Sequence, residues 1–177
     1  GGIVIAAKNA ETLRIINQKI RDREIDKRYL CITVGTPRPP QGEVSCFLLK
    51  DEQKKQVSVY HRPVPGGKTA VTRYRTLETR GELSLLEVEL LTGRTHQIRV
   101  HFASIGHPLA GDDLYGGHRD RIARQALHCA RQSFRVPAYS EVPGGIRLET
   151  PVGEHARTVA VESPLPEDMR ALLDAEI

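Results

Sequence analysis

Residues 91–116 read LTGRTHQIRVHFASIGHPLAGDDLYG, and they decide how the chain is organised. Just ahead of them, apolar and acidic residues alternate over residues 83–91, which predicts a strand that ends in Thr92-Gly93. Residues 95–105 then predict a helix, and Gly106 stands where a left-handed C-terminal cap belongs. The apolar face of this helix is predicted at Ile98, Phe102 and Ile105, and its cap at Thr95 or Gly93.

Basic side chains gather where this helix begins. Arg94 lies just ahead of the helix, and His96 and Arg99 lie on one side of it, roughly opposite the apolar face. The free backbone N–H groups of a helix start attract anions, and guanidinium groups bind phosphate or carboxylate in pairs of hydrogen bonds. The pattern indicates a phosphate or carboxylate site. An ordinary amphipathic helix with a solvated basic face would have the same pattern, and the residues alone leave both interpretations open.

Three histidines follow one another closely and raise the question of a metal. His96 and His101 are five positions apart, whereas two zinc ligands on one helical face are four apart. His107 does not complete a spacing that is typical of tetrahedral zinc sites. We therefore expect no metal site.

The rest of the chain contains many strand signals and two further helices. A helix is predicted over residues 10–20 with Asn9 as its N-cap, and a short one over residues 166–175. The first strand begins with its apolar run already in progress, so we expect further residues upstream in the parent protein. Strands are predicted at residues 1–7, 29–34, 43–49, 57–60, 69–77, 83–91, 127–134, 146–150 and 157–162. This order predicts an α+β fold, a mixed and mainly antiparallel β-sheet flanked by helices, in a single domain over residues 1–177.

Composition sets broad limits. The chain has 177 residues, of which 39% are hydrophobic and 27% charged, as in ordinary globular proteins. A net charge of +4 is a mild bias toward anionic partners. No apolar run approaches the roughly 20 residues of a membrane-spanning helix. Cys31, Cys46 and Cys129 lack metal or disulfide spacing, which favours reduced cytosolic thiols.

Residues 91–116 closely resemble the third motif of pseudouridine synthases of the RluA family. Four further segments resemble that family in the same order, and together they cover almost the whole chain. They are Lys27-Arg28-Tyr29-Leu30, residues 68–74, Ala126-Leu127-His128-Cys129 and residues 164–168. Residues 137–160 fit less well and resemble a longer hairpin than is usual.

The resemblance implies the pseudouridine synthase fold and an enzyme that detaches uracil from its ribose, rotates it and reattaches it through carbon 5. It implies no cofactor and no metal, an RNA substrate that is ribosomal rather than transfer RNA, and a cytoplasmic location. Tyr29 matches the tyrosine that stacks on the base and is implicated in removing the proton from carbon 5. Arg94 matches the basic partner of the aspartate nucleophile. RNA contacts are expected from Lys27, Arg28, His96 and Arg99.

One part of the family pattern is missing from the printed residues. The aspartate of these enzymes lies in a His-Arg-Leu-Asp-x-x-Thr-Ser-Gly motif, whose last glycine matches Gly1. His118-Arg119-Asp120 resembles it only superficially, because it follows the third motif and lacks the Thr-Ser-Gly sequel. We therefore expect this chain alone to be inactive, either as a fragment of an RNA-modifying isomerase or, alternatively, as a non-catalytic RNA-binding module with the same fold.

Overall fold

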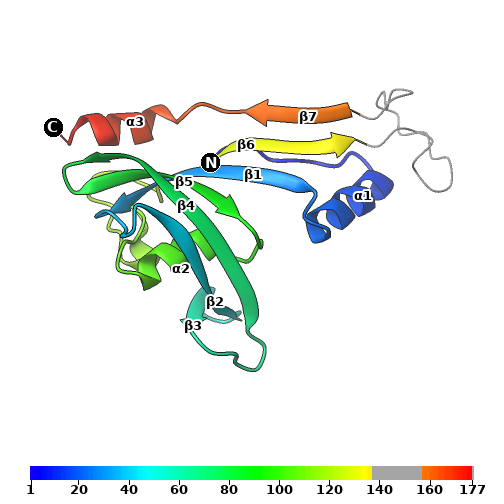
Figure 1. The fold of residues 1–177 in the computed structure, drawn as a ribbon, viewed down its shortest axis with the longest axis horizontal. Coiled ribbons are helices and arrows are strands. Elements are labelled where there is room, and N and C mark those ends of the chain that lie inside the picture. Colours follow the sequence, from blue (N-terminus) through cyan, green and yellow to red (C-terminus); the bar gives the residue numbers. More distant parts are fainter. Residues whose placement is uncertain (137–156, 177) are drawn as a thin grey trace.

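Seven antiparallel strands form one sheet in the order β3-β2-β4-β5-β1-β6-β7 (Figure 1). The computed structural model describes residues 1–136 and 157–176. The strands are β1 (Ile25–Val34), β2 (Gln41–Asp51), β3 (Gln56–Tyr60), β4 (Lys68–Arg80), β5 (Leu83–Leu90), β6 (Leu127–Val136) and β7 (Arg157–Glu162). The helices are α1 (Ala10–Arg21), α2 (Gln97–Ser104), the 3-10 turn η1 (Asp113–Tyr115) and α3 (Glu167–Asp174). The predicted α+β fold with a mainly antiparallel sheet is confirmed.

Alternation along the central strands gives the sheet two different buried faces. Ile32 of β1 points to the face that α3 covers, where it packs in a cluster with Leu85 and Leu173. Its neighbour Cys31 points to the other face, in the cluster that contains Leu86 and Phe102 of α2. Since neighbouring side chains of a strand point to opposite faces, β1 and β5 contribute apolar residues to both layers. Figure 1 shows α2 and α3 in these separate positions.

A buried chain of polar groups joins α2 to the sheet. Gln97 Nε2 donates to Thr72 Oγ1 at 2.9 Å, so the Thr72 hydroxyl is free to donate to His101 Nδ1 at 2.8 Å. A neutral imidazole that accepts at Nδ1 carries its proton on Nε2, and this nitrogen lies 2.9 Å from Cys46 Sγ. Burial lowers the pKa of His101 from 6.5 to about 4, which keeps the ring neutral near pH 7.

Two predicted features at the chain's first helix have different outcomes. The α1 helix is present, and Asn9 Oδ1 accepts from Thr12 N at 2.8 Å, as the cap prediction requires. Its apolar side chains are not buried, since Leu13 is 50% and Ile20 46% exposed.

The buried strand predicted at residues 1–7 is wrong. Gly2 forms one isolated parallel bridge to Cys129, and Val4 is 84% exposed. Cys129 pairs with Tyr29 on its other edge, so the bridge uses the edge of β6 that faces away from β1. From Arg131 onward that edge is taken by β7, which leaves the apolar run without a strand partner.

Smaller differences concern the ends of elements. Ile105 was predicted on the buried face of α2, but it lies just past the helix and is 39% exposed. Gly106 has φ 84°, as the predicted left-handed cap requires. The strand predicted at residues 146–150 lies outside the described residues. Within the described part of the chain, no helix is long and apolar enough to cross a membrane.

The buried neutral state of His101 predicts a pH dependence of stability. The unfolded chain binds a proton at His101 below pH 6.5, whereas the folded chain does so only below about pH 4. The free energy of unfolding should therefore fall as the pH drops from 6.5 to 4, by roughly 3 kcal/mol from this group, at about 1.4 kcal/mol per unit of pKa. Chemical denaturation at several pH values measures it. His101→Gln should flatten the slope in this window, and an unchanged slope in the variant would contradict the assignment.

Candidate active site

A cleft of about 920 Å³ opens between the end of α1, the first half of β1 and the turn after β5. Four of the residues predicted from the sequence line it, namely Lys27, Arg28, Tyr29 and Arg94. The strand β6 and the start of β7 complete its wall through residues such as Ser133 and Thr158. The volume is near the upper end of the range for ligand sites in proteins. The structure therefore brings the two residues assigned to catalysis to one cleft, while their roles stay predictions.

Tyr29 lies beside a break in the regular strand pairing. Arg28 pairs with Arg131 and Tyr29 with Cys129, so β6 has one extra residue, Ala130, at this step. Such bulges bend a strand and re-aim its side chains, and they are frequent beside active sites. Burial, with a further contribution from Cys129, raises the pKa of Tyr29 to about 12. The phenol is therefore neutral at physiological pH, with an aromatic face and a polar tip.

The turn that carries Arg94 is held by the side chain of Gln97. Its Oε1 accepts from the Arg94 backbone N–H at 3.0 Å and from the Thr92 hydroxyl at 2.8 Å. Its Nε2 donates to Val71 O at 3.0 Å and to Thr72 Oγ1 at 2.9 Å, both in β4. All four hydrogen bonds that this amide can make lie within the protein.

This function of Gln97 is absent from the predictions made from the sequence, although a signal for it was present. A glutamine three residues after the start of a turn commonly bonds back to the backbone N–H of that start, as in a capping box. The cap predicted at Thr95 or Gly93 is wrong, because His96 occupies the N-cap position with φ 54° and makes no side-chain cap bond. The Arg94 side chain is anchored as well, since Nε donates to Thr69 O at 3.1 Å.

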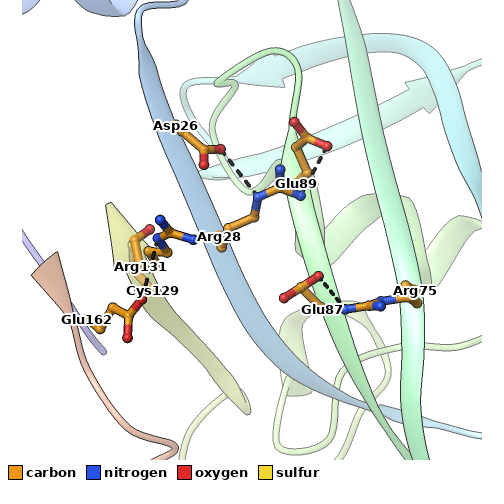
Figure 2. A network of polar contacts seen from close by, with 8 residues as sticks. All are labelled: Asp26, Arg28, Arg75, Glu87, Glu89, Cys129, Arg131 and Glu162. Carbon is orange, nitrogen blue, oxygen red and sulfur yellow. Dashed lines mark hydrogen bonds and ion pairs between the residues drawn. The ribbon is translucent and has the colours of Figure 1, made fainter. Parts of the chain in front are cut away.

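The acidic side chains of the cleft are all engaged by neighbouring cations. Of the residues that the structure describes, six basic and three acidic ones line it. Glu24 pairs with Lys19 at 2.8 Å. Figure 2 shows Arg28 between the other two acids, Asp26 at 3.3 Å and Glu89 at 3.2 Å. Arg28 thus lies on the cleft wall with its charge matched inside the protein.

Four cationic side chains of the cleft keep their charge unmatched in the described part of the chain. Among the described residues, those without an ion pair to a carboxylate are Arg21, Arg23, Lys27 and Arg94, and of these Arg21 donates only to the amide oxygen of Gln18. A surface attracts an anion through the charge that its own acids leave unneutralised. The cleft therefore presents a positive inner surface.

His96 and Arg99 lie away from this cleft. Arg99 donates two hydrogen bonds to Asp112, both at 2.7 Å, and its side chain is 13% exposed. Its guanidinium also lies 5.0 Å from the ring centre of Tyr115, whose hydroxyl is 2.9 Å from His96 Nδ1. Desolvation and the nearby Arg99 lower the pKa of His96. Arg99 thus has an internal partner, and neither residue lines the cleft that contains Tyr29 and Arg94.

The three histidines considered for a metal have separate partners. His96 contacts Tyr115, His101 contacts Thr72 and Cys46, and His107 Nδ1 lies 3.1 Å from Val34 O. Among the residues that the structure describes, no group of three or more histidine, cysteine, aspartate or glutamate side chains could hold a metal ion.

Comparison with known proteins gives the family. The model for RNA pseudouridylate synthases matches residues 1–104. The chain belongs to this family. The names of similar bacterial proteins place it, within the pseudouridine synthases, in the RluA family, as the resemblance of residues 91–116 predicted.

Individual relatives cover nearly all of the chain. It is 35% identical over 173 residues to the "Uncharacterized RNA pseudouridine synthase YhcT" of Bacillus subtilis. This alignment covers 97% of this chain and 51% of that protein. It is 34% identical over 165 residues to the "Ribosomal large subunit pseudouridine synthase C" of Vibrio vulnificus, over 89% of this chain and 50% of that protein. The chain thus spans about half the length of the bacterial relatives that it matches.

A solved structure supports the fold. The structure titled "Human RNA Pseudouridylate Synthase Domain Containing 4" superposes with a TM-score of 0.70 at 20% sequence identity. The match covers 94% of this chain and 67% of that one. The sheet and helices described above are therefore those of the pseudouridine synthase fold.

The contact between Arg99 and Asp112 predicts a difference between two adjacent aspartates. Asp112→Asn leaves a mostly buried guanidinium without its counter-charge, and should lower the free energy of unfolding by about 3 kcal/mol. Asp113→Asn is the matched control, since Asp113 pairs with Arg119 at the surface and should change stability by less than about 0.5 kcal/mol. Urea denaturation of both variants compares them. Equal changes in the free energy of unfolding for the two variants would show that the ion pair between Arg99 and Asp112 does not stabilise the fold.

Proposed function

We propose that the chain forms the larger part, as a single domain, of the catalytic domain of an enzyme that isomerises uridine to pseudouridine in structured RNA. The observation that carries this proposal is the common cleft, in which Tyr29 and Arg94 lie together with unmatched positive charge. Family membership supports the reaction type. In this reaction the bond between the ribose and N1 breaks, a bond from the ribose to carbon 5 forms, and the proton of carbon 5 is removed while N1 gains one.

Tyr29 is proposed to stack on the uracil. Its position at a bulge beside the cleft supports this role, because its backbone is held by strand pairing on both sides. A phenol with a pKa of about 12 stays protonated at neutral pH. Its removal of the proton from carbon 5 would therefore require that substrate or a nearby group first lowers this pKa.

Arg94 is proposed to pair with the carboxylate of an aspartate nucleophile. Two features support this: its side chain has no carboxylate partner among the described residues, and its Nε and its backbone N–H are both anchored by hydrogen bonds. A guanidinium beside a carboxylate keeps that carboxylate ionised, which a nucleophile needs. Anchoring at two points limits the freedom lost when the pair forms.

The substrate is proposed to be ribosomal rather than transfer RNA. The protein is proposed to be located in the cytoplasm. The names of several relatives refer to the ribosomal large subunit, which supports the first statement. The three buried free cysteines fit a reducing compartment, which supports the second. No cofactor or metal is proposed for the reaction.

The printed residues contain no aspartate motif of the family, so we propose that they do not catalyse the reaction alone. The second candidate function is a non-catalytic RNA-binding module with the same cleft. The unmatched cations favour RNA binding in either case. Activity separates the two candidates.

The first test compares two proteins. The 177-residue chain should not convert uridine, whereas the same chain preceded by the His-Arg-Leu-Asp-x-x-Thr-Ser-Gly motif, as the full-length protein supplies it, should do so. Groups that act as one unit lose nearly all activity when one member is removed. Pseudouridine is detected in ribosomal RNA after incubation with each protein. Turnover by the short chain would contradict the proposal, and inactivity of the full-length protein on ribosomal and transfer RNA would favour the binding module.

A second test concerns Arg94 in the full-length protein. Arg94→Ala should lower the rate on the order of 10²–10³-fold, because it leaves a carboxylate unpaired in a partly dry cleft. Arg94→Lys keeps the charge but loses the planar fork, so its rate should lie between those of the wild type and the alanine variant. Arg73→Ala is the control, since Arg73 pairs with Glu43 on an exposed part of the sheet. Equal rates for Arg94→Ala and Arg73→Ala would exclude the proposed pairing.

A further inference from the structure

Arg23 has a backbone conformation that disfavours arginine. It follows the C-cap of α1 with φ 57°, in the left-handed region where a Cβ is crowded. Helices often end in this way, but glycine is the usual residue at that position, because it has no Cβ. The sequence therefore keeps a strained residue where a less strained one is available.

The end of α1 does not need the Arg23 side chain. The turn is closed by backbone bonds alone, from Arg23 N to Ile20 O at 3.3 Å and from Glu24 N to Lys19 O at 2.9 Å. A glycine would form both bonds equally well. Cations are favoured at a helix C-terminus, but Lys19 and Arg21 already supply two in the last turn.

The side chain of Arg23 lines the cleft with Tyr29 and Arg94. Arg23 belongs to the wall formed by the end of α1, whereas Arg94 belongs to the turn after β5. Like Lys27, it has no ion pair with a carboxylate among the residues that the structure describes. The nearest acids in sequence, Glu24 and Asp26, are paired with Lys19 and Arg28. Strain in the backbone and an unmatched guanidinium thus coincide on one residue of the cleft.

We propose that Arg23 binds a phosphate of the RNA strand that occupies the cleft, so that the strand is held between the end of α1 and the Arg94 turn. This rests on the proposed function, since it names a contact for the same substrate. A guanidinium suits the task, because it binds phosphate oxygens in a fork and stays charged. A strained arginine at this position is explained if its side chain contributes more free energy to RNA binding than a glycine would contribute to the stability of α1.

The proposal predicts that stability and RNA affinity change in opposite directions. In the full-length protein, Arg23→Gly should raise the melting temperature by relieving the strained backbone, and should weaken binding to a uridine-containing RNA hairpin several-fold. The slope of log affinity against log salt should become shallower by about 1, the value for one lost phosphate contact. Lys55→Gly is the matched control, since Lys55 has φ 51° in the turn between β2 and β3 and does not line the cleft. It should raise the melting temperature and leave the affinity and slope unchanged.

A second variant separates charge from backbone. Arg23→Gln keeps the Cβ and most of the length of the side chain, so its loss of affinity and of salt dependence should equal that of Arg23→Gly without a gain in stability. If wild type and both Arg23 variants bind the hairpin with the same affinity and salt slope, the phosphate contact is excluded while the proposed function stands. If the wild type itself fails to bind structured RNA, the proposed function fails first. A melting temperature that falls in Arg23→Gly and rises in Lys55→Gly, with affinity unchanged, would assign Arg23 to the stability of α1 instead.

Discussion

The four hydrogen bonds of the Gln97 side chain connect the cleft to the interior. One amide group holds the backbone of the Arg94 turn through its oxygen and strand β4 through its nitrogen. The same nitrogen begins the buried series that passes through Thr72 and His101 to Cys46. Buried polar groups are costly unless each one has a partner, so this series has essentially one low-energy arrangement. The position of Arg94 follows from an interior constraint and not from the flexibility of a surface turn.

Some arginines of the chain are paired with a carboxylate and others are not, and the sequence alone does not separate these two classes. Arg28 and Arg99 lie in the segments that resemble the family most closely, yet both are paired with carboxylates of the same chain. Arg23 and Arg94 have no carboxylate partner within residues 1–136 and 157–176. Only the second class can gain from a phosphate without first losing an internal partner. The positive inner surface of the cleft therefore depends on a few side chains, although six basic residues line it.

Tyr29 combines a rigid position with a neutral phenol. Strand pairing to β5 and β6 holds its backbone, and the extra residue in β6 sets the local bend. Burial raises its pKa to about 12, so the ring supplies a stacking face and a hydroxyl hydrogen bond, without a charge of its own. In the proposed site, such a group orients the base without competing with Arg94 for an anionic partner. This division of tasks fits a site where one residue positions the base and another stabilises a carboxylate.

Local sequence determined the elements with strong periodicity. The α1 helix and its Asn9 cap, the strand that precedes residues 91–116, and the left-handed Gly106 all follow from short-range rules, because periodicity and capping depend on neighbours within a few residues. The same 26 residues were long and specific enough to indicate the family, and with it Tyr29 and Arg94.

Tertiary structure alone decided the rest. The apolar run at residues 1–7 has strand propensity, but β7 already occupies the edge of β6 along which it would have to extend. The sequence alone does not show which of the basic residues at the start of α2 are paired with a carboxylate and which are not. Only the fold brings Asp112 to Arg99 and places Arg94 in the wall of the same cleft as Tyr29. Pairing of edges and of charges depends on residues far apart in the chain, so no local pattern contains it.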